Sequence, residues 1–168
     1  DLNGLTIDGT SFSNLTQKGL YAETLSDALI TDITMSNVGV LGRGTAFGGG
    51  GTFGNGIDIN LKWDHESTSD TVDDAAPYSN ITIDGFTFTN VGSNSTGGSA
   101  IAVKARDDAP TYSSPESASF EGSVVIKNGS ISGSPVGIQA GEPNKGSPSA
   151  NVSGPAIDVE NVDNGATV

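Results

Sequence analysis

The stretch NITIDGFTFTNVG, residues 80–92, decides the fold, because the chain contains two further versions of it. One is LTIDGTSFSNL, residues 5–15, and the other is ALITDITMSNV, residues 28–38. Apolar, turn and Asn positions recur in the same order in all three. A short recurring unit buries its apolar face only by packing on its neighbours, so the pattern predicts a repeat architecture.

The copies align on a shared Asn, and seven positions earlier each has an Ile. A fourth copy, VVIKNGSI at residues 124–131, and a degenerate fifth, AIDV at residues 156–159, continue the series. Within each copy apolar and polar residues alternate, which predicts strands with one buried face. The shared Asn residues are predicted to form a ladder at an internal corner, one amide per repeat: Asn14, Asn37 and Asn90. The alternative is that they are separate turn residues that never touch.

A second series of strands lies between the copies of the first. It reads GLYA at 19–22, GIDI at 56–59, AIAV at 100–103 and VGIQA at 136–140, again with every other residue apolar. Gly9, Gly85 and Gly129 interrupt the first series and are expected to mark bends. The segments 42–55, 64–79, 106–122 and 141–154 are rich in Gly, Ser, Pro and Asp, which is typical of surface loops. We therefore expect each repeat to stack on its predecessor with parallel, in-register strands.

Three phrases of the sequence resemble one known fold family. NITIDGFTF at 80–88, GNGIDINLK at 54–62 and AIAVKARDD at 100–108 resemble the right-handed parallel β-helix, or pectin-lyase-like, superfamily. The resemblance implies an all-β fold, a single right-handed parallel β-helix (a solenoid) of about five layers with long loops. We expect residues 1–168 to form one such domain, as a fragment of a longer solenoid or a processed chain.

Composition narrows the classes of function. The net charge of −13 argues against nucleic acid as a partner, because phosphate binding requires a basic face. The absence of Cys excludes disulfides and thiolate chemistry, and no apolar run is long enough to span a bilayer. Acidity together with abundant Gly, Asn, Ser and Thr indicates an extracellular, secreted or cell-surface protein.

The outward positions of the second strand series gather the candidate binding residues. Three of only seven Lys and Arg residues fall there, beside acidic, amide and phenol groups. Cationic side chains pair with uronate carboxylates, so this face is predicted to bind an acidic polysaccharide. The alternative is a set of solvated charges on the outside of a sheet. The residues are Tyr21, Asp58, Asn60, Lys62, Lys104 and Arg106.

The resemblance also implies a candidate chemistry. Pectate-lyase-like enzymes use a basic residue on an outer parallel sheet as the base, which here implies Lys104, Arg106 or Lys62. WDHE at residues 63–66 loosely resembles the acidic-His cluster of mannuronan epimerases, with His65 as base and Asp64 as its partner. The alternative for His65 is a surface residue in a polar loop.

Calcium is the metal that the sequence favours. Carboxylates in loops are hard oxygen ligands, and two neighbouring loops carry clusters of them. Solubility of the loops is the alternative account of the same residues. The candidate ligands are Asp70, Asp73, Asp74, Asp107 and Asp108.

Two functions of different classes follow. The favoured one is a structural or adhesive extracellular module, stiffened by Ca²⁺, associated with polysaccharide or neighbouring protein modules, and able to associate end to end. The alternative is a polysaccharide lyase or C5-epimerase acting on uronate polymers at the outer face.

Overall fold

The computed structural model describes residues 2–40, 54–62, 77–92, 98–106, 119–141, 152–153 and 156–164. These residues form β-strands joined by turns, and none of the described elements is a helix. No described helix is therefore available to cross a membrane. The strands are β1 (Leu2–Asn3), β2 (Thr6–Asp8), β3 (Ser11–Leu15), β4 (Leu20–Ala22), β5 (Leu25–Ser26), β6 (Ala28–Val38), β7 (Ile57–Lys62), β8 (Pro77–Ser79), β9 (Ile81–Thr89), β10 (Ile101–Arg106), β11 (Ser119–Glu121), β12 (Val124–Ser132), β13 (Ile138–Ala140), β14 (Val152–Ser153) and β15 (Ile157–Asn164).

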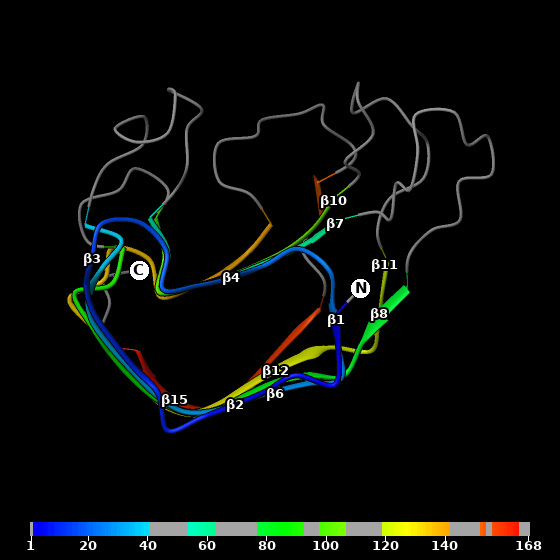
Figure 1. Ribbon diagram of the computed structural model, residues 1–168, viewed down its shortest axis with the longest axis horizontal. Helices are drawn as coiled ribbons and strands as arrows, with labels where there is room; N and C mark the ends of the chain where they lie inside the picture. The colour runs from blue at the N-terminus through cyan, green and yellow to red at the C-terminus, as the bar shows by residue number, and fades with distance from the viewer. Residues whose placement is uncertain are drawn as a thin grey trace.

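Two parallel sheets carry most of the architecture. One has the order β15-β12-β9-β6-β2, with β3 also pairing with β6, and the other has the order β13-β10-β7-β4. Strands that pair are consecutive members of one repeat series, so each repeat lies directly on the one before it. Figure 1 looks along the direction of pairing, and the strands of successive repeats overlie one another there.

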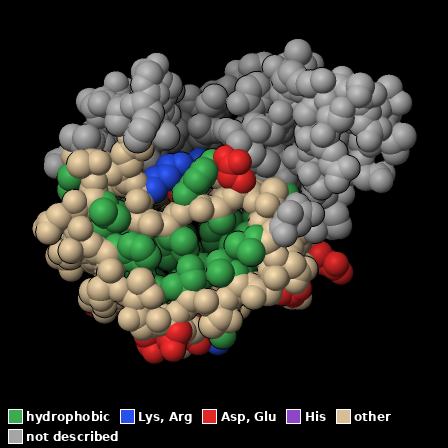
Figure 2. All heavy atoms as spheres, in the orientation of Figure 1, with side chains coloured by type: hydrophobic (Ala, Val, Ile, Leu, Met, Phe, Trp, Pro, Cys, Tyr) green, Lys and Arg blue, Asp and Glu red, His purple; other side chains and the backbone are tan. Residues whose placement is uncertain are grey.

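The register of the sheets follows the sequence alignment. Ile7 pairs with Ile30, Ile30 with Ile83, and Ile83 with Ile126. In the second sheet Leu20, Ile57, Ile101 and Ile138 form an equivalent column. The side chains of these columns face one another across a shared apolar core. Figure 2 shows hydrophobic side chains gathered inside the outline of the strands.

A third, shorter strand series completes each repeat. β1 pairs with β5, and β8 pairs with β11, in both cases in parallel. Backbone hydrogen bonds link the two pairs, since the Asp27 amide donates to the Ser79 carbonyl at 3.1 Å. In Figure 1 these strands lie at the right edge, between the two larger sheets. The sequence pattern predicted at least two strand series per repeat and did not identify this third one, because it contributes a single apolar residue per repeat.

One strand departs from the parallel arrangement. β14 pairs antiparallel with β10, matching Ala105 with Ser153 and Arg106 with Val152. The expected uniform parallel stacking therefore holds for the repeat strands but not for this added edge strand.

The bends between strands use a left-handed backbone that few residues adopt without cost. Every described residue with positive φ is Asn, Asp or Gly. Other residues lose about 1–2 kcal/mol in this conformation, because Cβ approaches the following carbonyl oxygen. The register gathers most of these residues into three columns: Gly4, Asp27, Asn80 and Gly122; then Gly9, Asp32, Gly85, Asn128 and Asn161; then Asn14, Asn37, Asn90 and Gly133.

The third column contains the predicted amide ladder. The Asn37 side-chain amide donates to Asn14 Oδ1 and the Asn90 amide donates to Asn37 Oδ1, each at 3.3 Å. The ladder stops at Gly133, where an added Cβ would lie 2.3 Å from Asn90 Oδ1. The prediction of an internal ladder was wrong in one respect: these Asn side chains are exposed. A left-handed residue at a corner turns its side chain outward, where water also solvates the amide.

The expected bend at Gly129 was also wrong. The left-handed residue is Asn128, with φ of 55°, and Gly129 follows it inside the strand. Gly129 is required for space, because an added Cβ would lie 2.3 Å from the ring of Phe86. Asn128 thus forms the turn, and Gly129 leaves space for the aromatic ring of Phe86 in the next layer.

Candidate functional site

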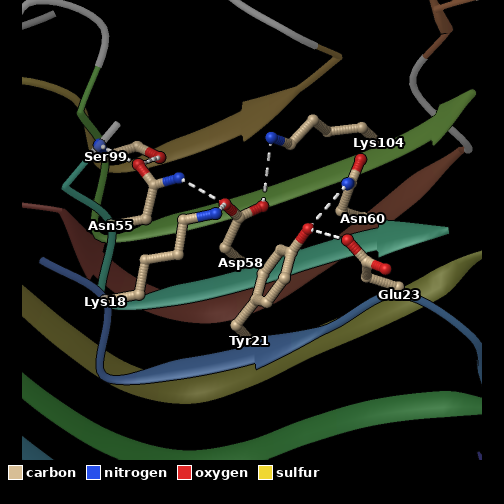
Figure 3. A network of polar contacts seen from close by, with 8 residues as sticks. All are labelled: Lys18, Tyr21, Glu23, Asn55, Asp58, Asn60, Ser99 and Lys104. Carbon is tan, nitrogen blue, oxygen red and sulfur yellow. Dashed lines mark hydrogen bonds and ion pairs between the residues drawn. The ribbon is translucent and has the colours of Figure 1, made fainter. Parts of the chain in front are cut away.

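Outward residues of β4, β7 and β10 build a polar cluster on the sheet that carries the second strand series. In β7 the side chains of Ile57, Ile59 and Leu61 enter the core, so the alternating residues Asp58 and Asn60 face the other way. They are nevertheless buried, with 0 % and 2 % of their surface exposed. Lys104 on β10 is 4 % exposed. We call the group the Asp58 cluster: Lys18, Tyr21, Glu23, Asn55, Asp58, Asn60, Ser99 and Lys104 (Figure 3).

The Asp58 carboxylate is the centre of the cluster. Lys18 Nζ lies 2.6 Å from Asp58 Oδ2, and Asn55 Nδ2 donates to the same oxygen at 3.0 Å. Lys104 Nζ lies 3.3 Å from Oδ1, an ionic contact without hydrogen-bond geometry. A carboxylate removed from water is stable only when it is paired. Here two cations from different repeats hold one buried carboxylate.

Lys18 makes a second contact that partly replaces water. Its Nζ lies 3.8 Å from the centroid of the Tyr21 ring, a cation–π geometry. Burial lowers the pKa of Lys18 below its usual 10.5, and the neighbouring Asp58 charge opposes that shift. The Lys18 ammonium therefore holds its proton less firmly than a solvated lysine.

Tyr21 links the buried carboxylate region to the outer surface. Its hydroxyl donates to Glu23 Oε1 and accepts a hydrogen bond from Asn60 Nδ2 at 3.1 Å. Burial, and next the hydrogen bond to Glu23, raise the pKa of Tyr21 above its usual 10.0. The residue is still 44 % exposed. Tyr21 is thus the member of the cluster with both a buried contact and a surface accessible to a ligand.

Asn55 fastens the cluster to the turn before β10. Its Oδ1 accepts from the Ser99 amide at 2.9 Å and from Ser99 Oγ at 3.3 Å. The two turns approach closely because Gly56 follows Asn55, and a Cβ there would lie 2.5 Å from the Ala100 carbonyl oxygen. Asn60 Oδ1, by contrast, is buried without a hydrogen-bond partner.

The structure brings together part of the predicted outer face. Tyr21 pairs in register with Asp58, and Asn60 with Lys104, as the alignment of the strands predicts. Lys62 and Arg106 are also paired in register through their backbones, but their side chains lie outside what the structure describes. The alternative of solvated charges does not fit Asp58, Asn60 or Lys104, because all three are buried.

The remaining predicted site residues fall on segments outside the described ranges. Among the residues that are described, no group of three or more His, Asp or Glu side chains is arranged to hold a metal ion. The predicted residues that lie outside are Asp64, His65, Asp70, Asp73, Asp74, Asp107 and Asp108.

Glu23 was not among the predicted site residues, and neither were three residues that precede the strands: Lys18, Asn55 and Ser99. Each stands two positions before the first inward residue of its strand, so they form one column of the repeat. That shared position was visible in the sequence. The reach of the Lys18 side chain to Asp58 in the next repeat was not, because it depends on a rotamer and not on the pattern.

Comparisons with known proteins add no family. A scan against protein-family models, a search of curated proteins and a search of solved structures each found no match to this chain. Function is therefore inferred from the fold and from the Asp58 cluster.

Proposed function

We propose that the chain is a right-handed parallel β-helix module of the pectin-lyase-like kind, with a structural or adhesive role outside the cell. Parallel in-register stacking of three strand series, with left-handed Asn, Asp or Gly residues at the bends, supports this fold. Such a stack is a stiff rod whose length grows with the number of repeats, which suits a surface layer, filament or adhesin.

The observation that carries the structural role is the internal pairing of the Asp58 cluster. Asp58 is fully buried, and its charge is shared between Lys18 and Lys104. Glu23 accepts the Tyr21 hydroxyl. The charged groups of the cluster are thus engaged with one another, and they join three successive repeats. This arrangement supports a role in fixing the register of the layers.

The proposed partners are neighbouring protein modules, further copies of the chain or an acidic polysaccharide, with Ca²⁺ as a stiffening ion. The inward side chains of the first described repeat, among them Ile7, Phe12 and Leu20, are only partly buried. A further layer placed on them would bury more apolar surface, which favours association. Light scattering and electron microscopy with and without Ca²⁺ test this. Ordered end-to-end association is expected, and persistent monomers in every salt condition would contradict the structural role.

A lyase or C5-epimerase of uronate polymers is the second candidate. The observation in its favour is Tyr21, a partly exposed phenol against Lys18, which is one of the two lysines that flank Asp58. The test is the ultraviolet absorbance of unsaturated products from alginate or pectate with Ca²⁺. We expect no rise. A rise that disappears in Lys104→Ala but persists in Lys127→Ala, a lysine paired with Asp84 on the other sheet, would establish the enzyme instead.

A further inference from the structure

The contact between Lys18 and Asp58 has the features of a pair ready for condensation. The Nζ atom lies 2.6 Å from Oδ2, and the carboxyl carbon is one covalent bond beyond that oxygen. Enzymic reactions proceed from atoms held at about 3–3.5 Å in a fixed orientation. Both side chains are largely removed from water, at 15 % and 0 % exposure, so little water competes for the contact.

We propose that Lys18 and Asp58 form an intramolecular isopeptide bond, a self-catalysed covalent link between the first and second repeats. This inference concerns a modification site and is independent of the proposed function. The surroundings supply what the reaction needs: a site largely removed from water, an amine whose pKa is lowered by burial, and polar groups on both carboxylate oxygens.

The atoms of the reaction balance without any added reagent. The Lys18 ammonium passes one proton to Asp58 Oδ2, which leaves a neutral amine and a neutral carboxylic acid. The Nζ lone pair attacks Cγ, and the Nζ–Cγ bond forms. Nζ then passes a second proton to the Oδ2 hydroxyl, the Cγ–Oδ2 bond breaks, and water leaves. The product is a neutral secondary amide that retains one proton on Nζ and Oδ1 as its carbonyl oxygen.

Each neighbour has a definite part in that sequence. Lys104 Nζ, 3.3 Å from Oδ1, stabilises the negative charge that develops on this oxygen in the tetrahedral intermediate. Asn55 Nδ2 donates to Oδ2, the oxygen that leaves, and orients the carboxyl group. Burial lowers the pKa of Lys18, so its ammonium loses a proton more easily than a solvated lysine does. The Tyr21 ring against Nζ limits the access of water to the same atom.

The structural consequence follows from the positions of the two residues. A bond between Lys18 and Asp58 would enclose residues 19–57 in a covalent loop that includes β4, β5 and β6. Closing a loop of this kind restricts the unfolded chain, as a disulfide does. This chain contains no Cys, so an isopeptide bond would be a covalent stabilisation that does not depend on redox conditions.

Intact mass spectrometry of the purified chain, denatured before injection, tests the proposal. The expected mass is lower than the sequence mass by one water, about 18 Da. Proteolysis should then yield one branched peptide that joins the segment containing Lys18 to the segment containing Asp58. Lys18→Arg and Asp58→Ala should each have the full mass calculated from the variant's own sequence, with no loss of water. The matched control Lys127→Ala should keep the deficit, because its ion pair with Asp84 lies on the other sheet. Lys104→Gln should slow the loss of water, which is followed in freshly purified protein over time.

The outcomes are distinguishable even if a variant does not fold. A wild-type mass equal to the sequence mass, after prolonged storage at neutral pH, overturns the proposal. A deficit of one water that mild alkali reverses indicates a succinimide at an Asp-Gly pair, such as Asp84-Gly85, and also overturns it. A branched peptide that contains Lys104 in place of Lys18 would place the bond at Lys104. That result would also overturn the proposal.

Discussion

Asn37 donates its side-chain amide to Asn14 Oδ1 at 3.3 Å, although 23 residues separate the two along the chain. Both residues have positive φ, and both occupy the same corner of successive repeats. Two requirements therefore favour Asn at this corner. One is the left-handed backbone, and the other is the side-chain hydrogen bond to the next repeat. This double requirement explains why the same Asn marks the first three copies of the repeat.

We expect Asn37→Ala to lower the free energy of unfolding by about 1–2 kcal/mol, because Ala adopts a left-handed backbone poorly and the ladder loses its central amide. Asn37→Gly keeps the backbone without strain and should lose less. Thr34→Ala, an exposed strand position in the same layer, is the control and should change stability by less than about 0.5 kcal/mol. Urea denaturation measures all three. Equal losses for the Ala and Gly variants would show that the left-handed conformation carries no cost here.

The shared core predicts a larger effect for Ile83. This side chain is fully buried and lies between Ile30 and Ile126 in adjacent layers. Ile83→Ala should cost about 2–5 kcal/mol, through lost apolar burial and the cavity that remains. Thr82→Ala, the next residue on the opposite face, is the matched control and should be nearly neutral. A loss below about 1 kcal/mol for Ile83→Ala would mean that the column is not packed as described.

Removal of Asp58 should be severe, because it leaves two lysines with no carboxylate between them. Asp58→Ala is expected to lower the free energy of unfolding by about 3–5 kcal/mol. Replacing the ionic group as a whole, with Asp58→Leu, Lys18→Met and Lys104→Met together, should recover much of that loss, since buried ion pairs are often no more stable than apolar packing. Thermal unfolding of the wild type, Asp58→Ala and the triple variant compares the three proteins. A triple variant as unstable as Asp58→Ala would show that Asp58→Ala is destabilised by lost packing and not by the two unpaired lysines.

Tyr21 predicts a specific alkaline behaviour. Its pKa is raised in the folded protein, so folding favours the neutral phenol. The stability that this contributes is fully present below the unfolded pKa of 10.0 and is lost as pH rises through the higher folded value. Tyr21→Phe should therefore be less stable than wild type at pH 8 but should lose stability less steeply above pH 10. Urea denaturation at a series of pH values measures the slope. An unchanged slope in the variant would contradict the hydrogen-bonded, buried state of the phenol.

The stacking of the repeats could be predicted from the sequence because the same pattern of apolar residues occurs in each repeat. Ile7, Ile30, Ile83 and Ile126 occupy one column as the alignment predicts, since the pairing register of a strand is set by its apolar face. The third strand series escaped notice because one apolar residue, such as Leu25, gives no alternation to detect. The sequence signal for this series was the pair of turn residues that follow its strands, Asp27 and Asn80. They can be recognised as equivalent only when the bends of successive repeats are aligned.

The candidate site was less predictable, for a physical reason. Strand alternation placed Asp58, Asn60 and Lys104 on one face, but it also suggested that they are solvated. Burial of that face depends on tertiary packing, which the pattern does not encode. Likewise Lys18 belongs to a turn, and a flexible side chain brings its charge to Asp58. Patterns identify where a backbone lies more readily than where a long side chain ends.

Successive repeats lie parallel to one another, and each lies directly on the one before it. Thr34 pairs with Thr87, and Thr87 with Ser130, on the outward face of one sheet. The chain has no Cys, so pairs of introduced cysteines report on this register alone. Disulfides form between Cα atoms about 4.4–6.8 Å apart, which suits adjacent strands and excludes strands two layers apart. Oxidation of Thr34→Cys with Thr87→Cys, and of Thr87→Cys with Ser130→Cys, should close an intramolecular disulfide in dilute protein. Thr34→Cys with Ser130→Cys should not. Closure of that skipped pair, or failure of both adjacent pairs in folded protein, would contradict the stacked arrangement from which every other conclusion follows.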